Sequence, residues 1–424
     1  MPAPPVAPRL HDLLAPLAGG TVPAHLVAWD GSTAGADPAE SPTVRICSPQ
    51  ALRRLMWAPG ELGAAQAFVT GEVEVDGDLG DALAHVRDEL VRRQPRPSPA
   101  ERAKAIAGLG VLAKDLGLLG ARPAPPASQA VVKGRLHSLG RDRAAISHHY
   151  DLSNDFYELI LDSQMAYSCG YVTQDGADLV RGREDEAYTL EQAQFDKLEL
   201  VCTKLGLHTR PDQRFVDVGC GWGSLTLHAA REHGARVVAV TISREQQAFV
   251  QARAQEQGVA DRVDVRLQDY REVPESDFDA VASIEMGEHV GDKNYRTYAS
   301  TLHRLAAPGA HVLVQQMSRP GKNPGGGPFI ESFIAPDMSM RPVGTTIELL
   351  ERAGLELRGV QALREHYAWT IRSWEQRLRE RRADVLALVG EEVTRVWELY
   401  LAGGAWTFAS GRMGVDQLLL RRSG

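Results

Sequence analysis

The chain has 424 residues, well beyond the ~100–200 residues of a usual domain, so we expect two domains and a large buried core. Hydrophobic residues make up 43% and charged residues 24% of the chain, which excludes wholesale disorder, collagen-like repeats and a disulfide-stapled miniprotein. The four cysteines are scattered without a C-x-x-C pair, which argues against a zinc ribbon or a disulfide framework and favours a reducing, cytoplasmic location.

Charge is distributed unevenly along the chain. The formal net charge is −8, yet residues 92–143 contain eleven Lys or Arg and three acidic residues. A basic belt of this kind suits phosphate groups, of anionic lipid headgroups or of nucleic acid, although a solvated linker also explains it. No apolar run approaches the ~18 residues of a membrane span, so we expect any membrane contact to be peripheral, at the inner face.

The first part of the chain contains three kinds of sequence. Residues 1–40 are rich in Pro, Ala and Gly, which predicts a loosely held terminus. Residues 41–95 mix strand-like and helix-like patterns, typical of a small α+β unit. Beyond them, prolines flank one predicted helix over residues 100–119, which indicates a linker.

Strands and helices alternate after a predicted helix over residues 184–205. Predicted strands cover residues 214–218, 236–241, 263–267, 278–284 and 310–317, and predicted helices end at residue 233 or cover 245–257 and 295–306. This order implies right-handed crossovers and a mostly parallel sheet, so we predict an α/β fold.

A glycine-rich segment connects the first of these strands to its helix. Residues 217–223 read Asp-Val-Gly-Cys-Gly-Trp-Gly, with glycines at 219, 221 and 223. Glycine allows the backbone to approach a ligand closely, and open α/β sheets bind ligands at the carboxyl ends of their strands. The G-x-G-x-G spacing differs from dinucleotide and phosphate-loop motifs, and a purely structural turn is the alternative.

This segment resembles the first motif of S-adenosylmethionine-dependent methyltransferases. In that family an acidic or polar residue at the end of the second strand binds the ribose of the cofactor. Residues at the end of the next strand lie beside its adenine. The resemblance therefore implies S-adenosylmethionine as cofactor, with contacts from Asp217, Gly219, Gly221, Gly223, Thr241, Ser243, Gln246, Asp269 and Tyr270.

A closer resemblance covers roughly residues 130–424. The segments 149–157, 165–171, 219–224 and 241–246, followed by Glu288-His289, His366-Tyr367 and Trp374, resemble the cyclopropane fatty acid synthase and mycolic acid methyltransferase family. The resemblance implies a Rossmann-like methyltransferase fold, methyl transfer to a cis double bond of a lipid acyl chain, and cofactor contacts from Tyr167 and Ser168.

The N-terminal unit resembles the extra domain of bacterial members that act on membrane phospholipids. We therefore divide the chain into a lipid- or membrane-docking domain over residues 1–120, a basic linker containing proline over 121–145, and a catalytic domain over 146–424. Expected partners are a phospholipid with an unsaturated acyl chain, an anionic membrane surface, a separate reductase and a second copy of the chain.

In the cyclopropane-forming relatives a bicarbonate ion acts as the base. A cysteine, a glutamate, a tyrosine and a histidine hold it. The first three map to Cys169, Glu288 and Tyr367, but Gln315 stands where the histidine is expected. Glutamine forms hydrogen bonds but does not accept a proton, so either bicarbonate is held with one altered contact or the base is arranged differently.

Methylation of an alkene produces a carbocation, which aromatic rings and a carboxylate stabilise. Loss of a proton with ring closure gives a cyclopropane, whereas a hydride shift before proton loss gives an exocyclic methylene, the precursor of a methyl branch. Because of Gln315 and the unusual sequence Glu285-Met-Gly-Glu288, we favour the methylene product. The candidate aromatic residues are Tyr150, Phe156, Tyr157, Tyr167, Tyr171, Tyr367 and Trp374.

Other functions have distinct signatures. The histidines show no metal-binding spacing, so we expect no metal. The acidic composition and the missing nucleic-acid methyltransferase motifs argue against a nucleic-acid substrate. A small-molecule methyltransferase and a catalytically silent lipid-binding protein are the alternatives that the sequence leaves open.

Overall fold

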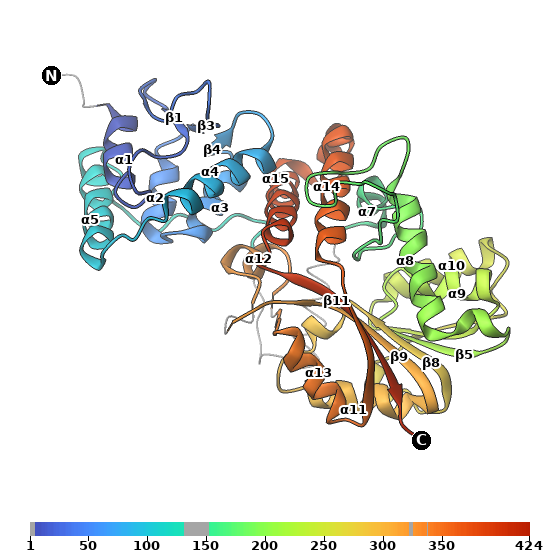
Figure 1. Cartoon of the computed structure of the whole chain (residues 1–424). Helices are drawn as coiled ribbons and strands as arrows, with labels where there is room; N and C mark the ends of the chain where they lie inside the picture. Colours follow the sequence, from blue (N-terminus) through green and yellow to red (C-terminus); the bar gives the residue numbers. More distant parts are fainter. Residues whose placement is uncertain (1–4, 131–151, 322–324, 337) are drawn as a thin grey trace. The chain divides into compact units, whose positions relative to one another are not determined.

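The computed structural model describes residues 5–130, 152–321, 325–336 and 338–424 (Figure 1). The chain forms two compact units. The first contains residues 1–130, 328–333 and 382–406, and the second contains residues 131–327, 334–381 and 407–424. The proposed roles of a docking domain, a linker and a catalytic domain stay predictions, and linker residues 131–145 and motif residues 149–151 lie outside the described residues.

The first unit contains a small mixed sheet with helices packed around it. Its strands are ordered β2-β1-β3-β4, with β1 and β3 parallel and the other two pairs antiparallel. Its elements are α1 (Val6–Leu14), β1 (His25–Ala28), β2 (Thr33–Gly35), β3 (Thr43–Ile46), α2 (Gln50–Trp57), α3 (Glu61–Val69), β4 (Val73–Val75), α4 (Leu79–Arg93), α5 (Pro99–Asp115), α12 (Pro328–Phe333) and most of α15 (Arg382–Ala409).

The N-terminal segment is part of the core of this unit. Val6 and Leu10 lie one helical turn apart on α1, and both are buried against Leu26 and Leu52. The prediction of a loosely held terminus over residues 1–40 is therefore wrong. The Pro, Ala and Gly content of the segment is typical of a loop, yet residues 6–14 form a short amphipathic helix.

The second unit contains a seven-stranded sheet with the order β10-β11-β9-β8-β5-β6-β7. Strands β7, β6, β5, β8 and β9 are parallel, whereas β11 runs antiparallel to both of its neighbours. Its elements are α7 (Asn154–Ile160), α8 (Leu190–Leu205), η1 (Leu207–Thr209), β5 (Arg214–Val218), α9 (Ser224–His233), β6 (Arg236–Thr241), α10 (Arg244–Glu256), β7 (Val263–Leu267), η2 (Tyr270–Glu272), β8 (Phe278–Ile284), η3 (Gly287–His289), α11 (Tyr295–Leu305), β9 (Ala306–Ser318), α13 (Val343–Glu351), β10 (Leu355–Ala362), α14 (Arg364–Glu380) and β11 (Gly414–Arg422).

Side chains of the central strands alternate between two apolar layers. Phe215 of β5 packs in the layer formed with α8, α9 and α10, whereas Val216 packs in the layer formed with α11 and α13. On β8, Ala280 and Val281 divide between the layers in the same way. Figure 1 shows the two groups of helices on opposite faces of the sheet. The predicted α/β fold with a mostly parallel sheet is confirmed.

Local signals fix where the helices near the sheet edge begin. Thr189 and Gln192 form a capping box at the start of α8. The helix therefore begins at Leu190, six residues later than the sequence pattern predicts.

No helix among the described residues is both long and apolar enough to cross a membrane.

Candidate active site

A cavity of about 220 Å³ lies at the carboxyl ends of the central strands of the second unit. The residues after β5, β6, β7 and β8 line it, as expected for a ligand site in an open α/β sheet. Nine of the predicted cofactor residues contribute to the lining: Tyr167, Ser168, Asp217, Gly219, Gly221, Thr241, Gln246, Asp269 and Tyr270.

The other two predicted cofactor residues, Gly223 and Ser243, do not line the cavity but lie at the starts of helices that border it. Gly223 (φ 78°) begins α9, and a Cβ there would lie 2.7 Å from the side chain of Val250. Ser243 caps α10, where its hydroxyl accepts a hydrogen bond from the Gln246 N–H at 3.2 Å. We therefore assign both residues to the support of the loop and helix that face the cavity.

The glycine loop leaves room for a ligand against its backbone. Gly219 and Gly221 have φ values of 80° and 54°, which non-glycine residues rarely adopt. A Cβ at Gly219 would lie 2.8 Å from the sulfur of Met286, whereas a Cβ at Gly221 would meet no atom within 4 Å. The first position therefore requires glycine for packing, and the second opens toward free space.

Polar side chains follow three neighbouring strands at this edge. Asp217 is buried, accepts a hydrogen bond from the Thr226 hydroxyl at 2.7 Å, and has a pKa that burial raises to about 6. Thr241 donates to the Gln246 carboxamide oxygen at 2.7 Å. With Asp269, which lies just after β7, they offer the donors and acceptors that a nucleoside requires, and the set fits S-adenosylmethionine.

A buried cation also lines the cavity. Lys197 of α8 is 1% exposed, and its ammonium donates to the Ser168 hydroxyl at 2.9 Å. Burial lowers the pKa of Lys197, while the nearby carboxylates of Asp162 and Glu285 act in the opposite direction. The lysine thus places a positive group among acidic residues in the interior, and no sequence motif indicated it.

Three of the four predicted catalytic residues converge on Glu285, which lies directly after β8. One carboxyl oxygen of Glu285 accepts from the backbone N–H of Cys169 and from the Gln315 amide, each at 2.8 Å. The other accepts from the Tyr367 hydroxyl at 2.6 Å. The structure therefore brings Cys169, Gln315 and Tyr367 together around a carboxylate that the family resemblance does not identify.

Glu285 is buried, and the hydrogen bonds that it accepts stabilise its ionised form, whereas its burial opposes ionisation. The residue adopts a φ of 50°, a costly conformation for a non-glycine residue. Burial raises the pKa of its carboxyl, and the bonds from Tyr367, Cys169 and Gln315 oppose that rise. A carboxylate with a raised pKa is a stronger proton acceptor than an exposed one.

A hydrogen bond to the carboxamide oxygen of Gln315 fixes the orientation of its side chain. Its carboxamide oxygen accepts from the Gln417 amide at 2.9 Å, and the Gln417 oxygen accepts from the ammonium of Lys204 at 2.6 Å. This chain of contacts directs the NH₂ group of Gln315 toward Glu285. Gln315 therefore serves as a donor there.

Cys169 contacts Glu285 through its backbone alone. Its thiol lies 3.1 Å from the Gly170 carbonyl oxygen and 3.6 Å from that of Leu363. Burial, and secondarily the charge of Glu285, raises the pKa of the thiol well above its ordinary value. The sulfur is consequently protonated, and the contact that the structure shows with Glu285 is made by the amide N–H.

Glu288 does not join this cluster. Its side chain is fully buried, and neither carboxyl oxygen meets a side-chain donor among the described residues. Burial, assisted by the charge of Glu285, raises its pKa to about 8, so it is mostly protonated at pH 7. The backbone N–H groups of Glu288 and Met317 lower the pKa of this carboxyl but do not offset its burial. The catalytic role expected for Glu288 stays a prediction that these contacts do not support.

Aromatic rings form a continuous series from the glycine loop to the Glu285 cluster. Trp222 lies 4.5 Å from Tyr157, which lies 5.7 Å from Tyr167, measured between ring centroids. The series continues through Trp374, 5.3 Å from Tyr167, to Tyr367, at 6.0 Å. Phe408 packs at 4.5 Å on the far side of Tyr367.

The remaining aromatic candidates lie elsewhere or cannot be placed. Tyr171 packs on His366 at 5.0 Å and Phe156 on Tyr157 at 5.4 Å, while Tyr150 lies outside the described residues. Sequence reasoning did not single out Trp222 or Phe408. Trp222 stands within the glycine motif, so its proximity to a ligand could have been inferred.

Comparison with known proteins identifies relatives over most of the chain. Residues 137–418 match the model of the mycolic acid cyclopropane synthetase family. The chain is 35% identical to a probable fatty acid methyltransferase of Mycobacterium tuberculosis, over 95% of this chain and 92% of that protein. It is 32% identical to the tuberculostearic acid methyltransferase UfaA1 of the same organism, over 95% of this chain and 88% of that protein.

Solved structures resemble the second unit. The cyclopropane synthase MmaA2 from Mycobacterium tuberculosis is 28% identical and matches with a TM-score of 0.59, over 65% of this chain and 97% of that one. The mycolic acid cyclopropane synthase CmaA1, in complex with SAH and CTAB, matches with the same TM-score at 30% identity, over 66% of this chain and 97% of that one.

The burial of Glu288 predicts an unusual dependence of stability on pH. A carboxyl whose pKa is raised from 4.5 to about 8 holds its proton more tightly in the folded than in the unfolded chain. The free energy of unfolding should therefore fall as the pH rises between these values. Because glutamine does not ionise, we expect Glu288→Gln to remove this fall and to be more stable at pH 8 by on the order of 2–4 kcal/mol.

Denaturant unfolding of both proteins from pH 5 to pH 9 measures this difference. The matched control is Glu256→Gln, which changes an exposed glutamate on α10 and should leave the pH profile as it is. A variant at position 288 that loses stability at pH 8 would contradict the assignment of a protonated, unpaired carboxyl.

Proposed function

The chain belongs to the mycolic acid cyclopropane synthetase family, and we propose that it methylates the cis double bond of an unsaturated acyl chain in a membrane phospholipid, leaving a methylene branch. It is an S-adenosylmethionine-dependent fatty acid methyltransferase. The phospholipid, the position of attack and the methylene product are the parts that we propose.

The cavity supports the cofactor assignment. When bound, S-adenosylmethionine supplies a methyl group activated by its sulfonium. The open side of Gly221 and the polar groups of Thr241, Gln246 and Asp269 are placed to hold its nucleoside part. Tyr167 and Ser168 belong to the same lining and lie next in sequence to Cys169, so the cofactor cavity and the Glu285 cluster are adjacent.

The aromatic series supports an alkene as the acceptor. An alkene is a weak nucleophile, so its methylation depends on alignment in a water-free chamber and on groups that stabilise a carbocation. Tyr167 and Glu285 both line the cofactor cavity. The rings of Trp374 and Tyr367 continue from Tyr167 to the Glu285 carboxyl, and the faces of these rings attract positive charge. An aromatic chamber would hold an apolar chain and disfavour a soluble, polar acceptor.

Glu285 is the group that we assign as the proton acceptor. It takes up the three donors, from Cys169, Gln315 and Tyr367, that the family resemblance assigns to the bicarbonate site. A carboxylate that is part of the chain therefore stands where a bound carboxylate-like anion is expected. We infer that the enzyme needs no bicarbonate, and that Glu285 accepts the proton lost from the transferred methyl group.

The coverage of the relatives favours the methylene product over the cyclopropane. After a hydride shift the positive charge lies on the methylated carbon, and loss of a proton from the new methyl group gives the exocyclic double bond. The relatives matched over about 95% of the chain are named fatty acid methyltransferases, whereas cyclopropane mycolic acid synthases match about 65%. A separate reductase would then convert the methylene to a methyl branch. Cyclopropane formation is the second candidate.

The first unit supports peripheral contact with an anionic membrane. On α5, Ile106 and Val111 are 61% and 57% exposed, and the exposed Arg102, Lys104 and Lys114 lie on the same helix. Exposed apolar side chains among basic residues suit contact with an anionic membrane surface. Docking there would bring the enzyme to phospholipid acyl chains.

Mass spectrometry of the lipid product tests the function and the role of Glu285. Incubation with dioleoyl phospholipid vesicles and methyl-labelled S-adenosylmethionine should yield a methylene-branched chain. Glu285→Gln should lower the turnover number by about 10²–10⁴-fold because the proton acceptor is lost. Glu256→Gln, at an exposed glutamate of α10, is the matched control and should retain the activity of the wild type.

Four outcomes would contradict parts of this proposal. Cyclopropane chains alone would exclude the methylene product. Activity that requires added bicarbonate in carbonate-depleted buffer would exclude Glu285 as the base. Equal product from the wild type and Glu285→Gln would mean that this carboxylate does not take part, and no product from either would favour a lipid-binding protein.

The backbone contact of Cys169 predicts tolerance at that position. Cys169→Ala keeps the N–H that donates to Glu285, so turnover should stay within about threefold of the wild type if only the amide acts. Tyr367→Phe removes a side-chain donor to the same carboxylate and should cost about tenfold or more. Steady-state rates of methyl transfer measure both, and a loss larger in Cys169→Ala than in Tyr367→Phe would show that the thiol acts.

Vesicle flotation tests the membrane contact. Replacement of Ile106 and Val111 by Glu should weaken binding to anionic phospholipid vesicles about tenfold or more, because two apolar side chains no longer insert and negative charge is added. Leu267→Glu, at an exposed leucine of the second unit, is the control. Equal binding of all three proteins would exclude α5 as the docking surface.

A further inference from the structure

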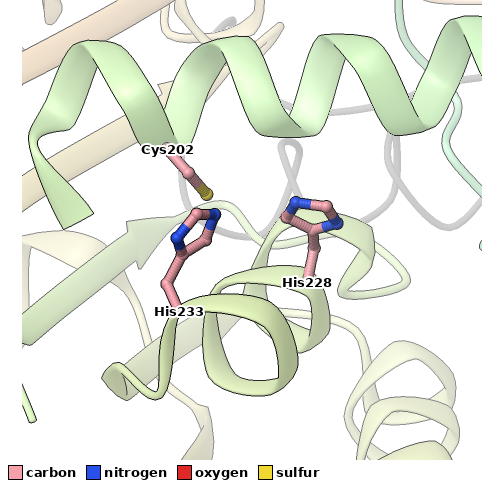
Figure 2. A group of neighbouring side chains, drawn as sticks. All are labelled: Cys202, His228 and His233. Atoms are coloured by element: carbon pink, nitrogen blue, oxygen red, sulfur yellow. The ribbon is translucent and has the colours of Figure 1, made fainter. Parts of the chain in front are cut away.

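A group of metal-binding residue types lies on two helices that pack side by side in the second unit. Cys202 extends from α8, and His228 and His233 extend from α9 toward it (Figure 2). One possible ligand atom of each residue lies within 4.8 Å of those of the other two. Cys202 and His228 are fully buried, and the side chain of His233 is 8% exposed.

Glu199 supplies a fourth donor from one turn earlier on α8. Its Oε2 atom lies 3.2 Å from Nε2 of His228 and 3.0 Å from Nε2 of His233. Ligand atoms about 2.0–2.1 Å from a tetrahedral zinc ion are about 3.3 Å from one another. The carboxylate oxygen and the two imidazole nitrogens are therefore spaced nearly as three corners of a zinc coordination sphere. The sulfur of Cys202 lies within 4.8 Å of a nitrogen of each imidazole and would move closer to complete the sphere.

A second observation points to a ligand here. The Cys202 thiol is fully buried and has no hydrogen-bond partner in the described part of the chain, although it lies close to the two imidazoles. Buried polar groups are normally satisfied, so an unpartnered sulfur beside two imidazoles indicates that something else binds.

We propose that Glu199, Cys202, His228 and His233 bind a structural divalent transition metal, of which zinc fits best. Thiolate, imidazole and carboxylate are the ligands that zinc takes in proteins, and four protein ligands leave no open position for chemistry. On binding, the Cys202 thiol releases its proton to solvent, and the negative charges of the thiolate and of Glu199 balance the 2+ charge of the ion. Glu199 is 40% exposed, which gives the ion an entry route.

The metal would clamp the two helices that support the cofactor cavity. Helix α8 carries Lys197, which lines that cavity, and α9 begins at Gly223 of the glycine loop. The ligands belong to no sequence motif, because they come as an i, i+3 pair on one helix and an i, i+5 pair on the next. The absence of a metal-binding spacing in the sequence therefore does not exclude the site.

Cobalt substitution tests the proposal without a catalytic readout. The full chain, stripped with a chelator and titrated with Co²⁺, should bind one equivalent and show a sulfur-to-cobalt charge-transfer band together with the intense visible bands of tetrahedral Co²⁺. Cys202→Ser should lose the charge-transfer band, and His233→Asn should weaken zinc affinity at least about tenfold. Cys47→Ser and His208→Ala, at exposed residues, are the matched controls.

Thermal unfolding gives an independent measurement. Zinc should raise the melting temperature of the stripped wild type and of both control variants, but not that of Cys202→Ser. A charge-transfer band that persists in Cys202→Ser, or Co²⁺ and Zn²⁺ that leave the spectrum and the melting temperature of the wild type unchanged, would overturn the proposal. Glu199 would then act only as a hydrogen-bond acceptor for the two imidazoles.

Discussion

The site depends on one buried carboxylate whose charge is held by donors from three other parts of the chain. Transfer of a carboxylate from water into the interior costs free energy, and hydrogen bonds to each oxygen are needed to offset it. At Glu285 these bonds come from the segment before α8, from β9 and from α14. The carboxylate can therefore be charged and dry only when the second unit is completely folded, which couples the chemistry to the fold.

The antiparallel edge of the sheet contributes to this coupling. Strand β11 lies between β9 and β10, and its register places Gln417 opposite Gln315. Gln417 in turn contacts Lys204 near the end of α8, so a series of side-chain contacts runs from a helix outside the sheet to Glu285. A parallel α/β sheet supplies the cofactor edge, and the added antiparallel strand supplies the orientation of the amide.

Much of the second unit could be predicted from sequence, because its signals are local. The periodicity of residues 214–284 identified four strands with their bounds, and the glycines at 219 and 221 located the cavity. The choice between Glu285 and Glu288 could not be made in this way. The two residues are three positions apart after the same strand, and a left-handed residue followed by a short 3₁₀ turn decides which carboxylate faces the cluster.

Other features were missed for related reasons. Lys197 reads as one more polar residue on an amphipathic helix, and only the packing of α8 shows that it is buried beside the cavity. The N-terminal helix was missed because its proline and alanine content is typical of a loop. In each case the deciding information is a contact between residues far apart in the chain.

The amide contact at Cys169 has a consequence for the durability of the enzyme. Lipids with double bonds generate peroxides, which attack ionised sulfur far faster than protonated sulfur. Burial raises the pKa of the thiols of Cys169 and Cys220, so both remain poor targets although they lie in or near the site. The pKa of the Cys47 thiol is raised as well, by partial burial and by Glu74, but this residue of the first unit is exposed, so oxidants should reach it before the buried cysteines of the second unit.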